Sequence, residues 1–148
     1  MKKHLGIEYD IVRYPPGDIY DEAVKKFGID FYNRGTVFAY APYIHAKSGK
    51  AEDHLVHHEL THFKQQAAVG GPAKWWRIYF DDPKQRMAWE LEAYQEQYKY
   101  VLENYRQKDH YPLLKEMAQF LVGMYDLDVS FEIAKEMIKN PELSPTLL

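Results

Sequence analysis

The segment Asp53–His62, DHLVHHELTH, holds four of the seven histidines of this 148-residue chain. Within it, only His58-Glu59-Leu60-Thr61-His62 places a glutamate directly after one histidine and a second histidine four positions later. Positions i and i+4 share one face of a helix, so two imidazoles can reach one Zn²⁺ while the adjacent glutamate reaches a metal-bound water. The segment therefore predicts His58 and His62 as metal ligands and Glu59 as a general base.

The residues around this segment predict the helix that the motif needs. The span Ala51–Val69 contains neither proline nor glycine, and Gly70-Gly71-Pro72 then ends it. Apolar residues at helical spacing predict a buried stripe along this helix at Val56, Leu60, Phe63 and Ala67. The two predicted ligands, His58 and His62, are not part of this stripe.

The competing interpretation is a solvated, histidine-rich helix face, or histidines satisfied by local hydrogen bonds. The motif, its place on a predicted helix and a further ligand downstream favour the metal site. We expect His54 at the rim of the site at most, and His57 to face solvent or the core.

The third ligand is expected to be a carboxylate. A catalytic zinc usually has three protein ligands and one open position, the chain has no cysteine, and the next histidine after His62 is His110. A helix is predicted to open at Asp82-Pro83, with Asp82 as its N-cap. Its core face is expected at Met87, Leu91, Tyr94, Tyr98, Val101 and Tyr105.

Two glutamates of that helix are candidates for this ligand. Glu90 and Glu92 are about 200° apart around the helix axis, and Glu92 belongs to a polar stripe expected in solvent. Glu90 lies at the edge of the apolar face, where a carboxylate needs a partner that a metal would supply. A salt bridge with Arg86, one turn earlier, is the alternative for Glu90.

These residues carry a family resemblance. His58–His62 followed by Glu90–Tyr94, ELEAY, resembles the gluzincins, zinc metallopeptidases with H-E-x-x-H and a downstream glutamate. The segment HELTHFKQQ looks most like small metallopeptidases of bacterial and phage genomes, whose second segment often reads N-P-x-E-x-x-A-Y. The resemblance covers about Thr36–Tyr98. Here Ala88 and Trp89 replace the usual Asn-Pro, and Tyr94 stands where thermolysin-like enzymes have Asp.

The resemblance implies a zinc-dependent peptidase with one zinc per chain. Zn²⁺ on His58, His62 and Glu90 would activate water and polarise the scissile carbonyl of a peptide or protein substrate. Glu59 would take the water's proton and deliver it to the leaving amine. We expect Tyr94 to stabilise the oxyanion, and four other residues are candidates for the same role: Tyr43, His45, Tyr98 and His110.

The resemblance also implies where a substrate binds. In such families a strand shortly before the active-site helix borders the substrate cleft, and Thr36–Ala41 matches that place. An extended peptide is therefore expected to pair through its main chain with this edge strand at four residues: Val37, Phe38, Ala39 and Tyr40.

Two other functions stay open beside the peptidase. One is a catalytically silent structural or interaction protein of the same fold, such as a phage virion component or a toxin-associated module. Glu59 argues against it, because a site kept only for stability does not need a general base. The other is a metal hydrolase of another kind, because the ligand set does not fix which bond is cleaved.

Composition excludes several classes of protein. The net charge of −3 and the absence of a Lys or Arg run argue against nucleic acid as a partner. No apolar segment approaches the roughly 20 residues that span a bilayer, and the N-terminus does not read as a signal peptide. We therefore expect a cytoplasmic protein without a membrane span, and the resemblance adds a phage or prophage origin.

The expected fold is α+β, one minimal zincin-like domain over residues 1–148. A small antiparallel or mixed sheet, from Ile7–Ile11 and Thr36–Ala41, precedes the motif helix and a mostly helical C-terminal half. Further helices are expected over Asp18–Phe27 with Asp18 as cap, after Pro112 up to about Gly123, and from the Ser130 cap to Lys139. Ala73–Phe80 is expected to be a core loop, with a cleft wall or docking surface as the alternative.

Overall fold

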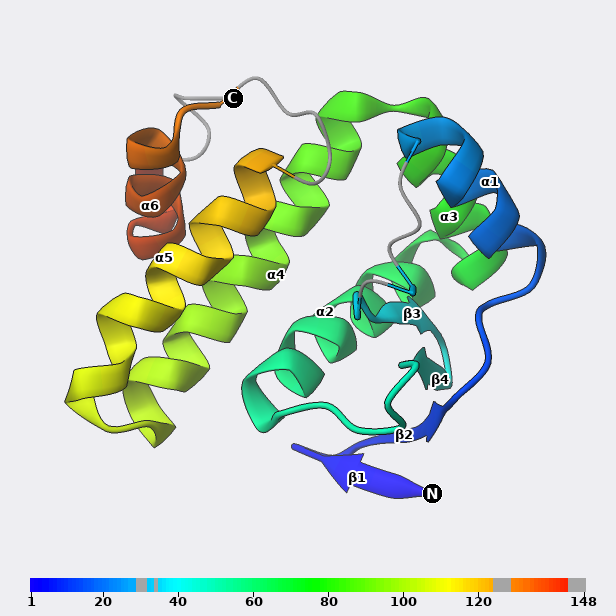
Figure 1. Cartoon of the computed structure of the whole chain (residues 1–148), viewed down its shortest axis with the longest axis horizontal. Helices are drawn as coiled ribbons and strands as arrows, with labels where there is room; N and C mark the ends of the chain where they lie inside the picture. Colours follow the sequence, from blue (N-terminus) through cyan, green and yellow to red (C-terminus); the bar gives the residue numbers. More distant parts are fainter. Residues whose placement is uncertain (29–31, 34, 124–128, 144–148) are drawn as a thin grey trace. The chain divides into compact units, whose positions relative to one another are not determined.

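A computed structural model describes residues 1–28, 32–33, 35–123 and 129–143 and has the expected α+β class (Figure 1). The chain divides into two compact units, Met1–Asp81 and Asp82–Leu148. In the described part, a small mixed sheet at the N-terminus is followed by a mostly helical remainder. None of the described helices combines the length and the apolar character needed to cross a membrane. That the chain folds as one domain stays a prediction.

The sheet belongs to the first unit and has the strand order β1-β2-β4-β3 among the described residues. These strands are β1 (Lys2–His4), β2 (Ile7–Val12), β3 (Phe38–Tyr40) and β4 (Tyr43–His45). β2 pairs antiparallel with β1 and parallel with β4, and β3 pairs antiparallel with β4. The strand predicted from Ile7 is confirmed, whereas the one predicted over Thr36–Ala41 is shorter, and it lies at the sheet edge as expected.

β1 was not expected from the sequence. Lys2 and Lys3 are exposed, so the strand carries no apolar alternation. It pairs with β2 because Leu5 and Gly6, both with positive φ (49° and 82°), form a two-residue connection between them. Turns with two positive φ values match the twist of antiparallel strands, which explains why so short a segment joins the sheet.

Helix α2 (Asp53–Val69) packs on the sheet, and their shared apolar side chains form the core of the first unit. Val56, Leu60 and Phe63 are buried as the predicted stripe requires, but Ala67 is exposed. The sheet contributes Tyr9, Ala39 and Ile44 to the same core. Gly70 ends α2 in a left-handed conformation with φ 104°, which a glycine adopts without strain.

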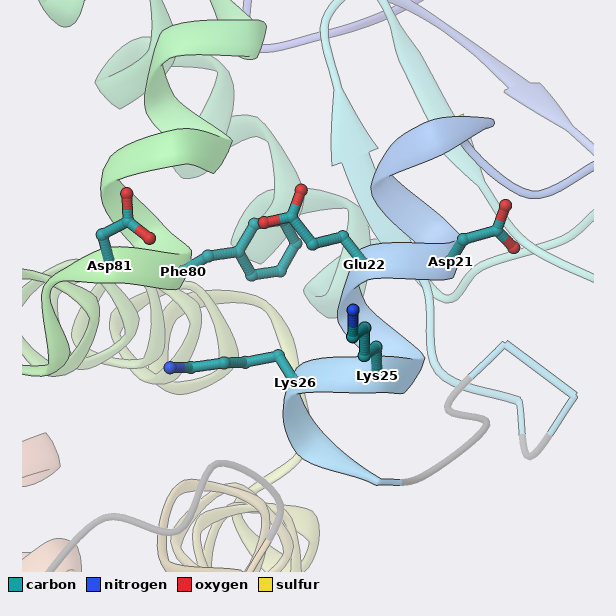
Figure 2. Close-up of a pocket in the computed structure, with 6 residues that line it drawn as sticks. All are labelled: Asp21, Glu22, Lys25, Lys26, Phe80 and Asp81. Atoms are coloured by element: carbon teal, nitrogen blue, oxygen red, sulfur yellow. The ribbon is translucent and has the colours of Figure 1, made fainter.

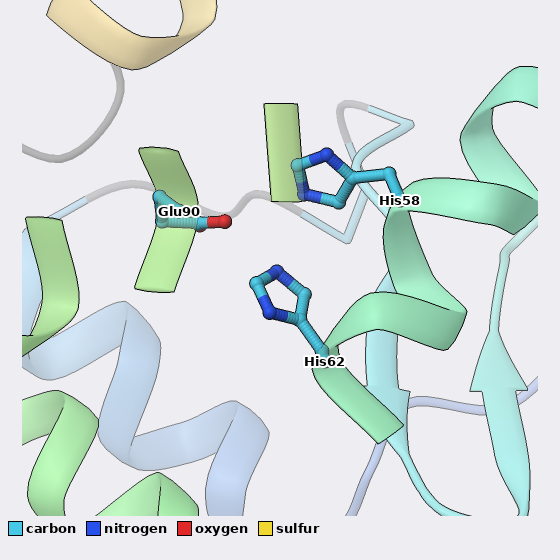
Figure 3. Close-up of side chains that lie close together, drawn as sticks. All are labelled: His58, His62 and Glu90. Carbon is cyan, nitrogen blue, oxygen red and sulfur yellow. The ribbon is translucent and has the colours of Figure 1, made fainter. Parts of the chain in front are cut away.

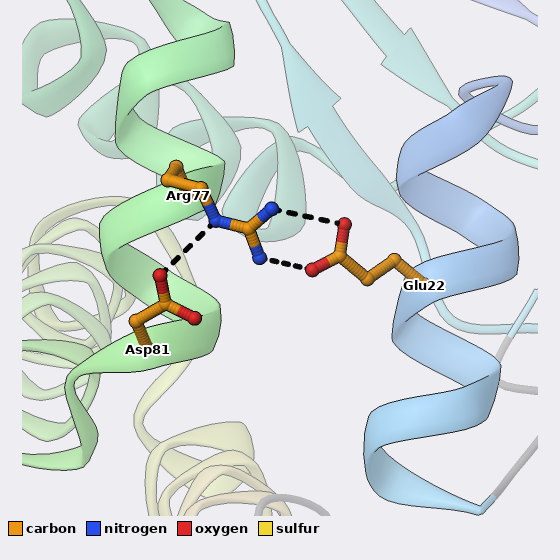
Figure 4. A network of polar contacts seen from close by, with 3 residues as sticks. All are labelled: Glu22, Arg77 and Asp81. Atoms are coloured by element: carbon orange, nitrogen blue, oxygen red, sulfur yellow. Dashed lines mark hydrogen bonds and ion pairs between the residues drawn. The ribbon is translucent and has the colours of Figure 1, made fainter.

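Two further helices complete the first unit, α1 (Asp18–Phe27) and α3 (Pro72–Asp81). Gly17, rather than Asp18, occupies the N-cap position of α1, and the predicted end at Gly28 is confirmed. The two helices are linked by an ion pair between Glu22 and Arg77, and Arg77 also bonds Asp81 one turn later at 3.1 Å (Figure 4).

α3 corrects the expectation of a loop over residues 73–80. Four aromatic side chains at helical spacing are buried on it: Trp75, Trp76, Tyr79 and Phe80. Their rings pack on one another, with centroids of Trp75 and Tyr79 4.8 Å apart. The burial of these large rings outweighs the modest helix propensity of aromatic residues, so the segment belongs to the core rather than to a docking surface.

The second unit contains α4 (Pro83–Asn104), α5 (Gln107–Gly123) and α6 (Phe131–Lys139), which pack on one another, and a 3₁₀ turn (Pro141–Leu143). Asp82 caps α4 as predicted, accepting from the Gln85 N–H at 3.1 Å, and Ser130 caps α6 through Ile133 N–H at 3.2 Å. Most of the core face predicted for α4 is buried in a cluster shared by the three helices.

α5 begins earlier than the sequence suggested. It starts at Gln107 and includes Pro112, which the prediction placed before the helix. A proline in a helix removes one backbone hydrogen bond. Four buried residues of α5 hold it in the unit's core despite that loss: Leu114, Met117, Ala118 and Leu121.

Candidate metal site

α2 brings the two predicted histidine ligands together. His58 and His62 stand one turn apart, with ring centroids 4.8 Å apart and ring planes at 83°. The i, i+4 spacing therefore brings the two rings together as predicted. Both are buried, with exposed fractions of 7% and 4%.

Glu90 of α4 is the third member of this group. Its side chain is 2% exposed. One ligand atom from each of His58, His62 and Glu90 can be chosen so that all three lie within 4.8 Å of one another (Figure 3). Two imidazoles and a carboxylate, all buried, are a donor set that fits a divalent transition metal ion. The group could therefore hold a metal.

Two neighbours of His62 were not anticipated. The Nδ1 atom of His62 is hydrogen-bonded to Oε1 of Gln65 at 2.8 Å, and Gln65 is itself buried. The His62 ring also packs on the Trp75 ring with centroids 4.9 Å apart. The sequence signal for Gln65 is its position three residues after His62 on the same helix, a spacing too common on solvated helices to single it out.

The two predicted catalytic side chains are also buried. Glu59 follows His58 on α2 and is 5% exposed. Tyr94 is 7% exposed and lies one helical turn after Glu90 on α4. Their roles as general base and oxyanion donor stay predictions.

The other histidines of the motif segment have local partners. His54 is buried, and its Nε2 atom lies 2.8 Å from Oε2 of Glu52. His57 is half-buried, and its Nδ1 atom lies 3.3 Å from Nε2 of His4 on β1. Neither belongs to the three-residue group found in the described part of the chain.

The other candidates for oxyanion stabilisation lie in varied surroundings. His45 is buried with its Nδ1 atom 2.8 Å from the carbonyl oxygen of Tyr14, and burial lowers its pKa. His110 is bonded through Nε2 to the carbonyl oxygen of Tyr105 at 2.9 Å. Burial raises the pKa of the Tyr98 hydroxyl, and Tyr43 is exposed.

The edge strand expected to receive a peptide already has hydrogen-bonding partners. The carboxamide of Gln66 donates to the Ala39 carbonyl at 2.8 Å and accepts from the Ala41 N–H at 2.9 Å. Trp76 Nε1 donates to the same carbonyl at 2.9 Å. A peptide pairing with Val37, Phe38, Ala39 and Tyr40 would have to displace these bonds at Ala39, so that binding mode stays a prediction.

A pocket of about 680 Å³ lies elsewhere in the first unit, between α1 and α3 (Figure 2). Its lining mixes acidic and basic side chains around one aromatic ring: Asp21, Glu22, Lys25, Lys26, Phe80 and Asp81. None of the candidate metal ligands lines this pocket, so it is not part of the candidate metal site.

Comparisons with protein-family models, with curated proteins and with solved structures find no match for this chain.

Proposed function

We propose that this protein is a zinc-dependent metallopeptidase whose metal is held by His58, His62 and Glu90. The observation that carries the proposal is the burial of these three side chains with their ligand atoms within 4.8 Å. The helical H-E-x-x-H spacing, with Glu59 next to a ligand, favours hydrolytic zinc over other metals that bind two histidines and a carboxylate.

Bound zinc would supply Lewis acidity, which lowers the pKa of a coordinated water and polarises a carbonyl. The residues of the chain supply the remaining steps. The Glu59 carboxylate accepts the proton of the attacking water and returns it to the amine nitrogen of the cleaved bond. Tyr94, one turn from Glu90 on α4, donates its hydroxyl hydrogen bond to the oxygen on which negative charge develops.

Glu59→Gln is the variant that tests this function. We expect the zinc-loaded wild type to cleave members of a mixed peptide library, read by mass spectrometry, and Glu59→Gln to lose at least about 100-fold of that rate. Glu59 is not a ligand, so the variant should retain its zinc. The matched control is the exposed Glu92→Gln on α4, which should cleave like wild type.

Two results would contradict the proposal. Zinc-loaded wild type that hydrolyses no peptide would favour a catalytically silent protein of this kind. Equal cleavage by wild type and Glu59→Gln would show that the hydrolysis comes from another source.

A further inference from the structure

The hydrogen bond between His62 and Gln65 defines which ring nitrogen of His62 carries a proton. The carboxamide oxygen Oε1 of Gln65 lies 2.8 Å from Nδ1. A carbonyl oxygen only accepts, so Nδ1 must be the donor and carry the hydrogen. In a neutral imidazole the other nitrogen, Nε2, then has the lone pair that can bind a metal.

The surroundings hold this arrangement in place. Gln65 is 6% exposed and His62 is 4% exposed, so water does not readily replace the bond between them. The indole of Trp75 packs on the imidazole with a centroid distance of 4.9 Å and an interplanar angle of 56°. The hydrogen bond sets the tautomer and the ring contact restricts the ring plane, which are the two properties that a metal-ligating histidine needs fixed.

We propose that Gln65 is a positioning residue that holds His62 in the Nδ1–H tautomer, ready to bind a metal through Nε2. In metal sites this role is commonly taken by a carboxylate or a backbone carbonyl. Here a neutral carboxamide from the same helix, three residues later, takes it. The purpose of the arrangement rests on the proposed metal site, but the tautomer itself is a property of the metal-free chain.

The first test uses metal-free full-length protein labelled with ¹⁵N. Imidazole nitrogen shifts, assigned through long-range ¹H–¹⁵N correlations, distinguish a protonated from an unprotonated nitrogen. We expect Nδ1 of His62 to be protonated in the wild type and in Gln65→Glu, whose carboxylate also accepts. Gln65→Leu should lose the preference. A wild-type His62 whose Nδ1 is unprotonated would overturn the proposal.

The second test measures zinc affinity by competition with a chelating dye. Removing a residue that orients a ligand typically costs about 10–100-fold in metal affinity. We expect a loss of that size for Gln65→Leu and wild-type or tighter binding for Gln65→Glu. Thr61→Val is the matched control, because it removes a buried hydroxyl on the same helix that bonds the backbone oxygen of His57 at 3.0 Å.

The two tests separate this inference from the proposed function. A wild type with the Nδ1–H tautomer that binds no zinc would refute the metal site and leave the tautomer assignment intact. A wild type that binds zinc while Gln65→Leu binds it equally well would refute the role of Gln65 and leave the metal site intact. Circular dichroism of each variant shows whether a loss of zinc affinity comes only from unfolding. If Gln65→Leu unfolds, the zinc affinity of the folded variant Gln65→Glu decides the question.

Discussion

At the residue scale, His45 couples the stability of the first unit to pH. Burial lowers its pKa, and the hydrogen bond to the Tyr14 carbonyl opposes that shift only in part. The unfolded chain, with a histidine pKa near 6.5, therefore binds a proton more readily than the folded chain. The stability that neutral His45 contributes is complete above about pH 6.5 and is lost as the pH falls through the lower folded-state pKa.

The measurement is urea unfolding of wild type and His45→Asn between pH 7.5 and 5. The asparagine amide can still donate to the Tyr14 carbonyl but does not titrate. We expect the wild type to lose up to about 1.4 kcal/mol per pH unit more than the variant below pH 6.5. The same pH dependence in both proteins would contradict this account of His45.

The residues of the candidate site could be predicted to different degrees. Helix geometry alone places His58 beside His62. The apolar residues around Glu90 on α4 distinguish it from Glu92, and the structure shows Glu90 buried and Glu92 exposed. Gln65 could not be selected in the same way. A glutamine three residues after a histidine is common on solvated helices, and only its burial makes the bond to His62 persistent.

At the element scale, Gln66 closes the outer edge of β3. Its carboxamide bonds Ala39 and Ala41 as an adjacent strand would, and it is fully buried. An uncovered strand edge invites pairing with other chains. Among the described strands β3 has no neighbour on this side, and the Gln66 side chain takes that place.

We expect Gln66→Leu to destabilise the protein by about 1–3 kcal/mol, because it leaves the Ala41 N–H without its acceptor. The variant should also aggregate more readily. Urea unfolding and light scattering measure the two effects. Lys64→Leu, at an exposed position of the same helix, should change stability by less than about 0.5 kcal/mol. Equal stability of Gln66→Leu and wild type would show that the edge does not need this cap.

Helices with a clear apolar periodicity or a helix-capping residue could be predicted from the sequence. Elements that form because of tertiary packing could not. α1, α2 and α6 have apolar stripes and end signals in the sequence, and they form where expected. The sequence of α3 reads as an aromatic run, and its helix depends on rings that pack on each other and on α2. β1 has no apolar face and depends on its pairing with β2.

At the scale of the whole molecule, the α+β class and the position of the described strands before α2 follow from where the apolar period changes along the chain. The division into two compact units could not be seen, because Asp81 and Asp82 join α3 to α4 without a linker of distinctive composition. The proposed ligands belong to α2 and α4. A bound ion would therefore add its binding free energy to the folded chain.

The metal content of the purified protein tests this account most directly. We predict one zinc per chain by elemental analysis in wild type after dialysis against a weak chelator. Glu90→Ala should lose most of that zinc, whereas the control Glu92→Ala, on the same helix and exposed, should keep it. A wild type that holds no zinc after reloading, that holds iron instead, or that keeps its zinc in Glu90→Ala would contradict the assignment of His58, His62 and Glu90 as a zinc site.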